Sequence, residues 1–332
     1  MTSERILVTG GSGFLGSALV KKLLREGWQV RVLDNNSRGH ARRLADVIDD
    51  IDFIVGDVRD YGVVESACKG MDVVAHLAYI NGTEFFYSMP EQILEVGIKG
   101  ALNTIDACLA HKIDRYWILS SSEVYQRAEK VPTDEAAALV IPDVLNPRYS
   151  YGGGKIATEL LAVNYGRKAF RQLAVVRPHN VYGADMGFEH VLPQLIMRAA
   201  RLDKETPKGQ VIDFPIRGSG AQTRAFVYVD DFTEGCYTAF TQAEKCSFFH
   251  IGTMDEVKIK DVVSIVLDVF DRNGNIIPSE SPSGETDRRC PDIARIQSLG
   301  YKPKTNLKEG IKKMAEWYIE NESLWPGTSN VP

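Results

Sequence analysis

The sequence predicts an α/β fold in which a doubly wound parallel sheet carries helices on both faces. Short β-branched runs alternate with longer helical patterns through the first half of the 332-residue chain, as in parallel strands joined by crossover helices. The runs are apolar at consecutive positions, so we expect strands that are buried on both faces. Because such crossovers are right-handed, a doubly wound topology is favoured.

Six segments are expected to be strands of this sheet, and three longer ones to be helices between them. The strands are expected at 6–8, 30–33, 53–55, 73–75, 116–119 and 173–176, and the helices at 15–25, 91–111 and 155–165. After Tyr182, glycine and proline separate shorter elements, until a last helix expected at 307–319. We therefore expect a main domain over residues 1–182 and a smaller α/β lobe over 183–332, with segments that return to the main sheet.

Composition and charge restrict the class of protein. Hydrophobic residues make up 44% of the chain and charged residues 25%, which is ordinary for a globular protein with a sizeable core. A net charge of −5 without a basic run argues against nucleic acid as a partner. No apolar run reaches the roughly 18 to 20 residues of a membrane span, and no signal peptide is recognisable. The five cysteines are scattered without a CxxC pair, so we expect reduced thiols, a cytoplasmic location and no metal site.

A glycine-rich turn follows the first expected strand and opens the first expected helix. Gly10, Gly13 and Gly16 of the segment TGGSGFLG suit a tight turn, a close approach of the backbone to a pyrophosphate, and close packing of the helix. The helix N-terminus offers N–H groups and a positive dipole to the phosphates. Tight turns also use glycine for structural reasons alone, but the strand–turn–helix context predicts a Rossmann-type dinucleotide site.

The end of the second expected strand bears on which dinucleotide binds. Asp34 stands there, 18 residues after Gly16, where a carboxylate can bind both hydroxyls of the adenosine ribose and repel a 2′-phosphate. This favours NAD over NADP, although Arg38 opposes the preference because a guanidinium would bind that phosphate. Asp57, after the third strand, lies where an adenine ring is expected, or else it is a carboxylate of a turn or helix cap.

Tyr151 and Lys155 are four residues apart and therefore share one face of an expected helix. An ammonium group near a nicotinamide cation lowers the pKa of a phenol, which makes Tyr151 a candidate general base near neutral pH. The three glycines between them are poor helix formers, so tertiary contacts must hold this turn. The YxxxK pattern is common by chance, but hydroxyl residues of the run LSSSEVY at 119–125 end an upstream strand at the edge where such sheets bind ligands.

Together these motifs resemble the extended short-chain dehydrogenase/reductase family and, within it, the NAD-dependent nucleotide-sugar epimerases and dehydratases. The resemblance covers almost the whole chain. It rests on TGGSGFLG, GDV at 56–58, HLA at 76–78, SSSEVY, YGGGK, RPHNVYG at 177–183, RAFVYVDD at 224–231 and RRCPD at 288–292. It implies NAD bound by a Rossmann domain at 1–182 and a nucleoside-diphosphate sugar bound mainly by 183–332.

The resemblance also implies roles for individual residues. Tyr151 would take the proton of the sugar 4-hydroxyl while hydride leaves C4 for NAD, Lys155 would hold the nicotinamide ribose and lower the pKa of Tyr151, and Ser121 would bond to the same sugar oxygen. The implied cofactor contacts are Gly10, Gly13, Phe14, Leu15, Asp34, Asn35, Arg38, Asp57, Val58, Leu77 and Ala78, together with Tyr151 and Lys155. The implied substrate contacts are Thr83, Ser122, Asn180, Arg224 and Arg289, and the two arginines would bind the diphosphate unless they form surface ion pairs.

Two departures from the family pattern lie near the expected nicotinamide site. Gly97 stands where many relatives carry an asparagine, so we expect one polar contact to be missing. The loop at 79–87 is unusually rich in aromatic residues. It either lines the sugar pocket and determines substrate choice, or packs against the protein itself.

Glu123 bears on the reaction that follows oxidation at C4. By the resemblance, simple 4-epimerases carry a small or hydroxylic residue at its position, whereas 4,6-dehydratases and some decarboxylases carry glutamate. A carboxylate two residues from Ser121 can remove the C5 proton, but Glu123 can also be a surface acid at the strand end. His179 is a candidate second acid or base, with a hydrogen-bonded structural histidine as the favoured alternative.

Three functions remain open at this point. The first is an epimerase or dehydratase that recycles NAD; the second is a decarboxylase or a net NAD(P)-dependent 4-oxidoreductase. The third is a non-catalytic Rossmann module that senses NAD, against which Ser121, Tyr151 and Lys155 argue. We also expect a homodimer in which the helices at 91–111 and 151–165 pair with their copies in a four-helix bundle, as the resemblance implies.

Overall fold

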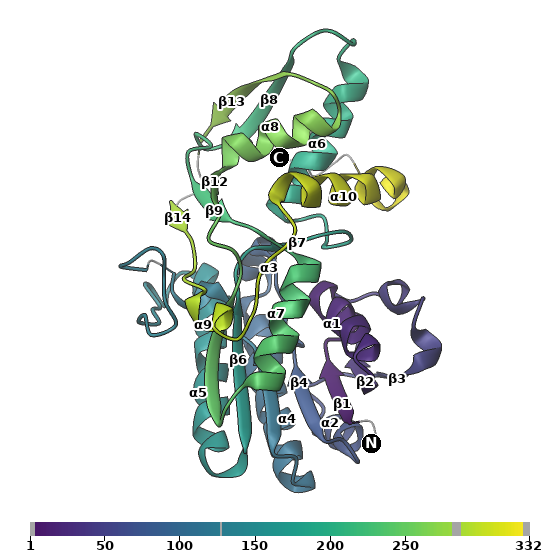
Figure 1. The fold of residues 1–332 in the computed structure, drawn as a ribbon, viewed down its shortest axis with the longest axis vertical. Helices are drawn as coiled ribbons and strands as arrows, with labels where there is room; N and C mark the ends of the chain where they lie inside the picture. The colour runs from purple at the N-terminus through teal and green to yellow at the C-terminus, as the bar shows by residue number, and fades with distance from the viewer. Residues whose placement is uncertain (1–3, 127, 281–286, 328–332) are drawn as a thin grey trace.

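The computed structural model describes residues 4–126, 128–280 and 287–327. Figure 1 shows two parts stacked along the long axis of the molecule. The larger part is built on a seven-stranded sheet. The smaller part is formed mainly by α6 (Val191–Glu205), α8 (Ile259–Val269) and α10 (Leu307–Glu320) with short strands.

The main sheet is parallel throughout and has the strand order β11-β6-β5-β4-β1-β2-β3. Its strands are β1 (Arg5–Thr9), β2 (Gln29–Asp34), β3 (Ile51–Val55), β4 (Val73–His76), β5 (Arg115–Leu119), β6 (Gln172–Pro178) and β11 (Cys246–Ile251). All six expected strands form, which confirms the predicted fold class. The direction of winding reverses between β1 and β4, the point at which open α/β sheets bind ligands.

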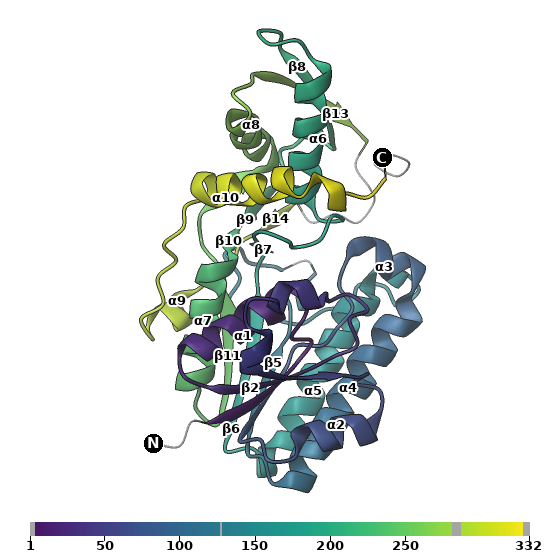
Figure 2. The same cartoon turned by 90° about the vertical axis from the view of Figure 1, so that its right-hand side faces the viewer.

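Helices cover both faces of this sheet, as Figure 2 shows. One face carries α1 (Phe14–Arg25), α7 (Val229–Gln242) and α9 (Ala294–Gln297), and the other carries α2 (Tyr61–Cys68), α4 (Pro90–His111) and α5 (Ser150–Ala169). Because side chains alternate along a strand, Ile6 and Val8 of β1 enter the core under α1, whereas Leu7 enters the core on the opposite face.

The third strand differs from the prediction. Residues 53–55 were expected to be buried on both faces, but β3 is the edge strand of the sheet, and Val55 is 69% exposed. An edge strand has a neighbour on one side only and less helix above it, so a short apolar run does not guarantee burial.

The smaller part has a core of its own. Strand β8 alternates buried and exposed residues, and its buried Ile212, Phe214 and Ile216 pack with residues of α6, α8 and α10. Short strands complete this part and join it to the main sheet. They are β7 (Val181–Tyr182), β8 (Ile212–Arg217), β9 (Thr223–Ala225), β10 (Val227–Tyr228), β12 (Glu256–Lys258), β13 (Gly274–Ser279) and β14 (Arg288–Arg289).

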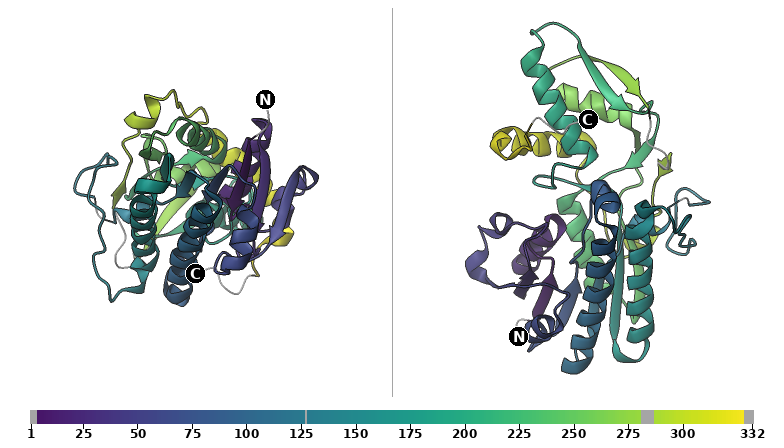
Figure 3. Two further views of the ribbon diagram at one scale, coloured as in Figure 1. Left: turned by 90° about the horizontal axis from the view of Figure 1, so that it is seen from below. Right: turned by 180° about the vertical axis from the view of Figure 1, so that it is seen from behind.

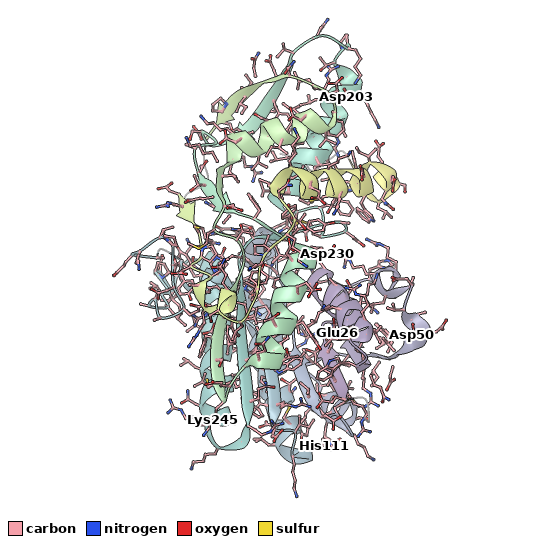
Figure 4. All side chains as sticks on the ribbon, in the orientation of Figure 1. Glu26, Asp50, His111, Asp203, Asp230 and Lys245 are labelled. Carbon is pink, nitrogen blue, oxygen red and sulfur yellow. The ribbon has the colours of Figure 1, made fainter. Side chains whose placement is uncertain are left out.

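The carboxyl ends of the main strands face the smaller part. In Figure 4, Lys245 before β11 and His111 at the end of α4 lie near the amino ends of the strands, far from the smaller part. Asp230 at the start of α7 lies near the junction of the two parts. Seen from behind, α4 and α5 lie side by side along the main sheet (Figure 3). Within the described ranges, none of the helices has the length and apolar character needed to cross a membrane, and the five cysteines carry free thiols.

Candidate active site between the two parts

A cavity of about 660 Å³ opens where the carboxyl ends of the main strands meet the smaller part. Every residue that the sequence predicts to bind cofactor or substrate lines this cavity, as do Ser121, Glu123, Tyr151 and Lys155, whereas the further acid–base candidate His179 does not. The fold thus brings together motifs from positions 10 to 289 of the chain. The individual roles of these residues stay predictions.

The glycine-rich turn forms one end of the cavity. Gly10 has a φ of +73°, and a Cβ there would lie 2.7 Å from the backbone of Ala78, so only glycine fits. Helix α1 begins at Phe14, and its N-cap residue Gly13 makes no side-chain cap. The first N–H groups of α1 are therefore left to a ligand, as a pyrophosphate would require. This end of the cavity fits a dinucleotide.

Two carboxylates follow along the expected adenosine end. The Asp34 side chain accepts hydrogen bonds from the backbone N–H groups of Ser12 at 2.9 Å and Asn36 at 2.8 Å, and these fix its orientation. Asp57 pairs with Arg59 at 2.8 Å, and this contact lowers the pKa of Asp57 to about 2. Asp57 also accepts the Arg59 backbone N–H at 2.9 Å, so it is a turn carboxylate as well as a wall of the cavity.

Arg38 is held by contacts that the sequence did not predict. Its guanidinium forms an ion pair with Glu189 and donates to the carbonyl of Asn81 at 3.2 Å. It also lies 4.2 Å from the centroid of the Phe85 ring. Because Glu189 already compensates its charge, Arg38 is poorly placed to bind a 2′-phosphate. Glu189 also lines the cavity, but it stands in a loop without a periodic pattern that could have indicated it.

The candidate catalytic residues meet where β5 ends and α5 begins. Tyr151 and Lys155 lie on the first turns of α5 and are 6% and 4% exposed. The hydroxyl of Ser121 hydrogen-bonds the Tyr151 phenol and also accepts the backbone N–H of Glu123 at 3.1 Å. The Lys155 ammonium donates to the carbonyl of Leu119 at 2.6 Å. This arrangement places the candidate base, a hydroxyl partner and the Lys155 amine on one wall.

In the protein without NAD, burial dominates the protonation of this pair. Burial raises the pKa of Tyr151 above its ordinary value, and the hydrogen bond with Ser121 opposes this only in part. Burial also lowers the pKa of Lys155 to about 7, against the favourable charge of Glu159. In the protein alone, Lys155 therefore does not bring the pKa of Tyr151 down. Its nitrogen lies 5.9 Å from the Tyr151 ring centroid, and a further positive charge is needed.

Glu123 lies inside the cavity and is not a surface acid. Its carboxylate pairs with Arg289 at 2.5 Å, and both side chains line the cavity. Burial raises the pKa of Glu123, but Arg289, Arg148 and Arg224 outweigh it and hold the pKa below its ordinary value. Glu123 is therefore an anion in a cationic wall. Arg148, just before α5, is a member of this wall that the motifs did not reveal.

His179 is not the hydrogen-bonded structural histidine that the sequence favoured, because neither of its ring nitrogens has a hydrogen-bond partner among the described residues. It is 1% exposed and stacks edge-on against His250, with 4.7 Å between ring centroids. Burial lowers its pKa well below the ordinary value. Its two neighbours, Pro178 and Asn180, line the cavity, whereas His179 does not. The Asn180 amide donates to the carbonyl of Ala225 at 3.0 Å.

The aromatic loop at 79–87 both lines the cavity and packs against the protein, and its part in substrate choice stays a prediction. It forms α3 (Thr83–Ser88), and Thr83 lines the cavity. Phe86 lines it as well and stacks on the Tyr151 ring at 4.9 Å, while Tyr79 contacts the edge of the same ring at 5.2 Å. The loop therefore encloses the candidate base from two sides.

Comparison with known proteins is consistent with this geometry. Residues 6–252 match the NAD dependent epimerase/dehydratase family. The chain is 30% identical to UDP-glucuronic acid decarboxylase 1 of Arabidopsis thaliana (93% of the chain, 68% of that protein) and 29% identical to a putative UDP-glucose 4-epimerase of Methanocaldococcus jannaschii (95% and 99%). The structure superposes on the dTDP-glucose 4,6-dehydratase DesIV of Streptomyces venezuelae, solved with NAD bound, with a TM-score of 0.85, 25% identity and coverage of 97% and 98%.

Proposed function

Because the chain belongs to the NAD-dependent epimerase/dehydratase family, we propose that its cavity binds NAD at the glycine-rich end and a nucleoside-diphosphate sugar at the Glu123 end. The observation that carries this proposal is the position of Tyr151, Lys155 and Ser121 on the wall between those two ends. The protein is an NAD-dependent enzyme of the epimerase/dehydratase type. The identity of its sugar and the roles of its residues are the proposal.

The chain supplies the binding groups for both ligands. The uncapped N–H groups at the start of α1 would hold the pyrophosphate of NAD, and the Asp34 carboxylate would bind the adenosine ribose. Arg224 and Asn180 line the other end and would hold the sugar diphosphate. When bound, NAD supplies the hydride acceptor for oxidation at C4 and a positive charge beside Lys155.

Tyr151 would act as the general base. The Ser121 hydroxyl, already bonded to the phenol, orients it toward the sugar 4-hydroxyl. Lys155 lies four residues further along the same helix face and would stabilise the phenolate once the cavity carries added positive charge. The proton of the 4-hydroxyl would then pass to the Tyr151 oxygen.

Glu123 is the residue on which the outcome at C5 depends. Its ionised carboxylate can remove the C5 proton, which becomes acidic beside a C4 ketone, and this supports 4,6-dehydration alongside 4-epimerisation. A second candidate is decarboxylation, favoured by Arg148 and Arg289 beside Glu123 in the same wall. A guanidinium there would bind a carboxylate at C6 of the sugar in a bidentate manner.

The assembly we propose is a homodimer formed through α4 and α5. Both helices expose large apolar side chains to solvent. Leu94 and Leu109 on α4 are 37% and 42% exposed, and Leu160 and Tyr165 on α5 are 59% and 46% exposed. Figure 3 shows the two helices side by side, so their outer surfaces can pack against a second copy about a two-fold axis. The free thiols support a reducing location such as the cytoplasm.

A substrate panel tests the function. The purified protein with NAD is incubated with UDP-, GDP-, dTDP- and CDP-sugars, and products are identified by mass spectrometry and chromatography. Loss of water, loss of carbon dioxide, or an isomer of unchanged mass identifies dehydratase, decarboxylase or epimerase. Tyr151→Phe is expected to reduce turnover by about 10²- to 10⁴-fold. Unchanged turnover in Tyr151→Phe would overturn the catalytic assignment, and binding of NAD without turnover of any sugar would support a sensing module.

A further inference from the structure

Tyr79 occupies a slot between α4 and α5 that two glycines keep open. It follows the HLA segment at the end of β4, and the proposed function gives it no role. A Cβ on Gly97 of α4 would lie 2.5 Å from the Tyr79 hydroxyl, and a Cβ on Gly154 of α5 would collide with the same hydroxyl. A side chain at either position would therefore push the ring out of its place.

From this slot Tyr79 contacts both members of the candidate catalytic pair. The Lys155 nitrogen lies 3.9 Å from the Tyr79 ring centroid, over its face, well within the range of a cation–π contact. The ring also meets Tyr151 edge-on, at 5.2 Å and an interplanar angle of 85°. Lys155 is 5.9 Å from the Tyr151 ring, so Tyr79 is the closer aromatic neighbour of the ammonium.

The buried environment disfavours the charged form of Lys155, which the contact with the Tyr79 ring stabilises. Burial lowers the pKa of Lys155, and among the charged side chains Glu159 opposes the effect from the next turn of α5. His76 of β4 faces the ammonium but is neutral, because burial and Lys155 lower its pKa to about 3. Tyr151 and Tyr79 are neutral too, since burial raises the pKa of both phenols. The Tyr79 ring face is thus a stabilising partner for the cation.

The ring and not the hydroxyl of Tyr79 makes these contacts. The hydroxyl is buried and has no hydrogen-bond partner within the described part of the chain. An unpaired buried hydroxyl costs free energy, so packing alone does not explain a tyrosine here in preference to a phenylalanine, and nothing in the structure explains that choice. The inference concerns the ring.

We propose that Tyr79 is a positioning residue whose ring keeps the Lys155 ammonium charged and in place beside Tyr151, and that Gly97 and Gly154 are glycines because they admit this ring. The importance of the Tyr79 ring for catalysis rests on the proposed function of Tyr151 and Lys155. The effect of the ring on the charge of Lys155 is independent of that function and can be measured without substrate.

The first test follows the titration of Lys155 in the full-length protein without cofactor. Lysine labelled with nitrogen-15 gives one side-chain NMR signal per lysine, and Lys155→Met identifies the signal of interest. Tyr79→Leu is expected to lower the titration midpoint of Lys155 by about one pH unit, the worth of a desolvated cation–π contact. Tyr79→Phe keeps the ring and is expected to leave the midpoint unchanged. An unchanged or higher midpoint in Tyr79→Leu would overturn the proposal.

The second test displaces the ring without removing it. Gly97→Ala is expected to lower the titration midpoint of Lys155, as Tyr79→Leu does, because the new methyl group takes the place of the Tyr79 ring. In the Tyr79→Leu background the same Gly97→Ala substitution is expected to add little, since the colliding ring is gone. Additive shifts in the double variant would show that Gly97 acts independently of Tyr79. Circular dichroism confirms that each variant is folded.

The third test asks whether the contact between the Tyr79 ring and Lys155 affects turnover. A less stable ammonium leaves Tyr151 with a higher pKa, so the acid limb of the kcat/KM profile is expected to move to higher pH in Tyr79→Leu and to stay in place in Tyr79→Phe. If the Lys155 midpoint shifts but no nucleotide sugar is turned over, the proposed function fails and the inference on Tyr79 stands. If turnover depends on Tyr151 but the midpoint is unmoved, the inference fails alone.

Discussion

Asp34 and Glu123 are two carboxylates at different positions along one cavity, and their partners give them different uses. Asp34 is fixed by two backbone N–H groups and so presents its oxygens rigidly, as recognition of a ribose requires. Glu123 is held by Arg289 and stays ionised among arginines. The sequence predicted Asp34 from its position at the end of a strand and Glu123 from the family resemblance, but it did not indicate their partners, such as Arg289.

At the Asp34 site we expect the apo-protein to bind NAD at least about tenfold more tightly than NADP, because a fixed carboxylate repels a 2′-phosphate. Calorimetric titration with both cofactors checks this. Asp34→Asn is expected to narrow the difference. Glu189→Gln, which releases Arg38, is expected to improve the binding of NADP. Equal affinities in the wild-type protein would show that Arg38 and not Asp34 governs the site.

At the Glu123 site we expect the loss of the carboxylate to stop chemistry at C5. With a substrate identified by the panel and deuterated solvent, Glu123→Gln is expected to exchange C5–H about 10²- to 10⁴-fold more slowly than wild type. Glu256→Gln is the matched control, since Glu256 pairs with the neighbouring Arg288 and does not line the cavity. Absence of exchange in the wild-type enzyme would remove this role and exclude 4,6-dehydration.

At the scale of the elements, α5 shows what local sequence can and cannot predict. The pattern of Tyr151 and Lys155 predicted a helix through three consecutive glycines, and α5 forms there because tertiary contacts hold it. The sheet was predictable for a similar reason, since each apolar run is local. Strand β11 was not identified by its residues, because its first half is not buried and its identity depends on pairing with β6. The places of Arg148, Glu189 and Tyr79 likewise depend on packing between distant segments.

Substitution by alanine is expected to change the stability of the fold in opposite directions at two glycines of α5, Gly153 and Gly152. A Cβ on Gly153 would lie 3.2 Å from the flexible end of the exposed Ile141 side chain, so Gly153→Ala is expected to stabilise the fold by about 0.5–1 kcal/mol through helix propensity. A Cβ on Gly152 would lie 2.7 Å from the carbonyl oxygen of Glu123. Gly152→Ala is therefore expected to destabilise by about 1–3 kcal/mol. Urea unfolding measures both, and equal effects would contradict the packing seen in α5.

At the scale of the whole molecule, the cavity is formed by both parts, and neither the main sheet nor the smaller part completes it alone. Ion pairs of Arg42 and Arg43 with Asp185, at 2.7 and 3.0 Å, join the loop after β2 to the segment that leads into the smaller part. The outer surface of α4 and α5 lies away from this junction (Figure 3). A second copy could therefore cover that surface without closing the cavity.

The homodimer prediction follows from that surface. We expect the wild-type protein to be a dimer by light scattering at micromolar concentration, because exposed leucines on two adjacent helices give an apolar surface that a second copy would cover. Leu160→Glu places a charge on this surface, where an unpaired buried charge is costly, and is expected to yield folded monomers. Ile277→Glu is the matched control, since Ile277 is 45% exposed on β13 of the smaller part, away from α4 and α5. A wild-type monomer would contradict the prediction, and a dimer that survives Leu160→Glu but not Ile277→Glu would move the interface to the smaller part.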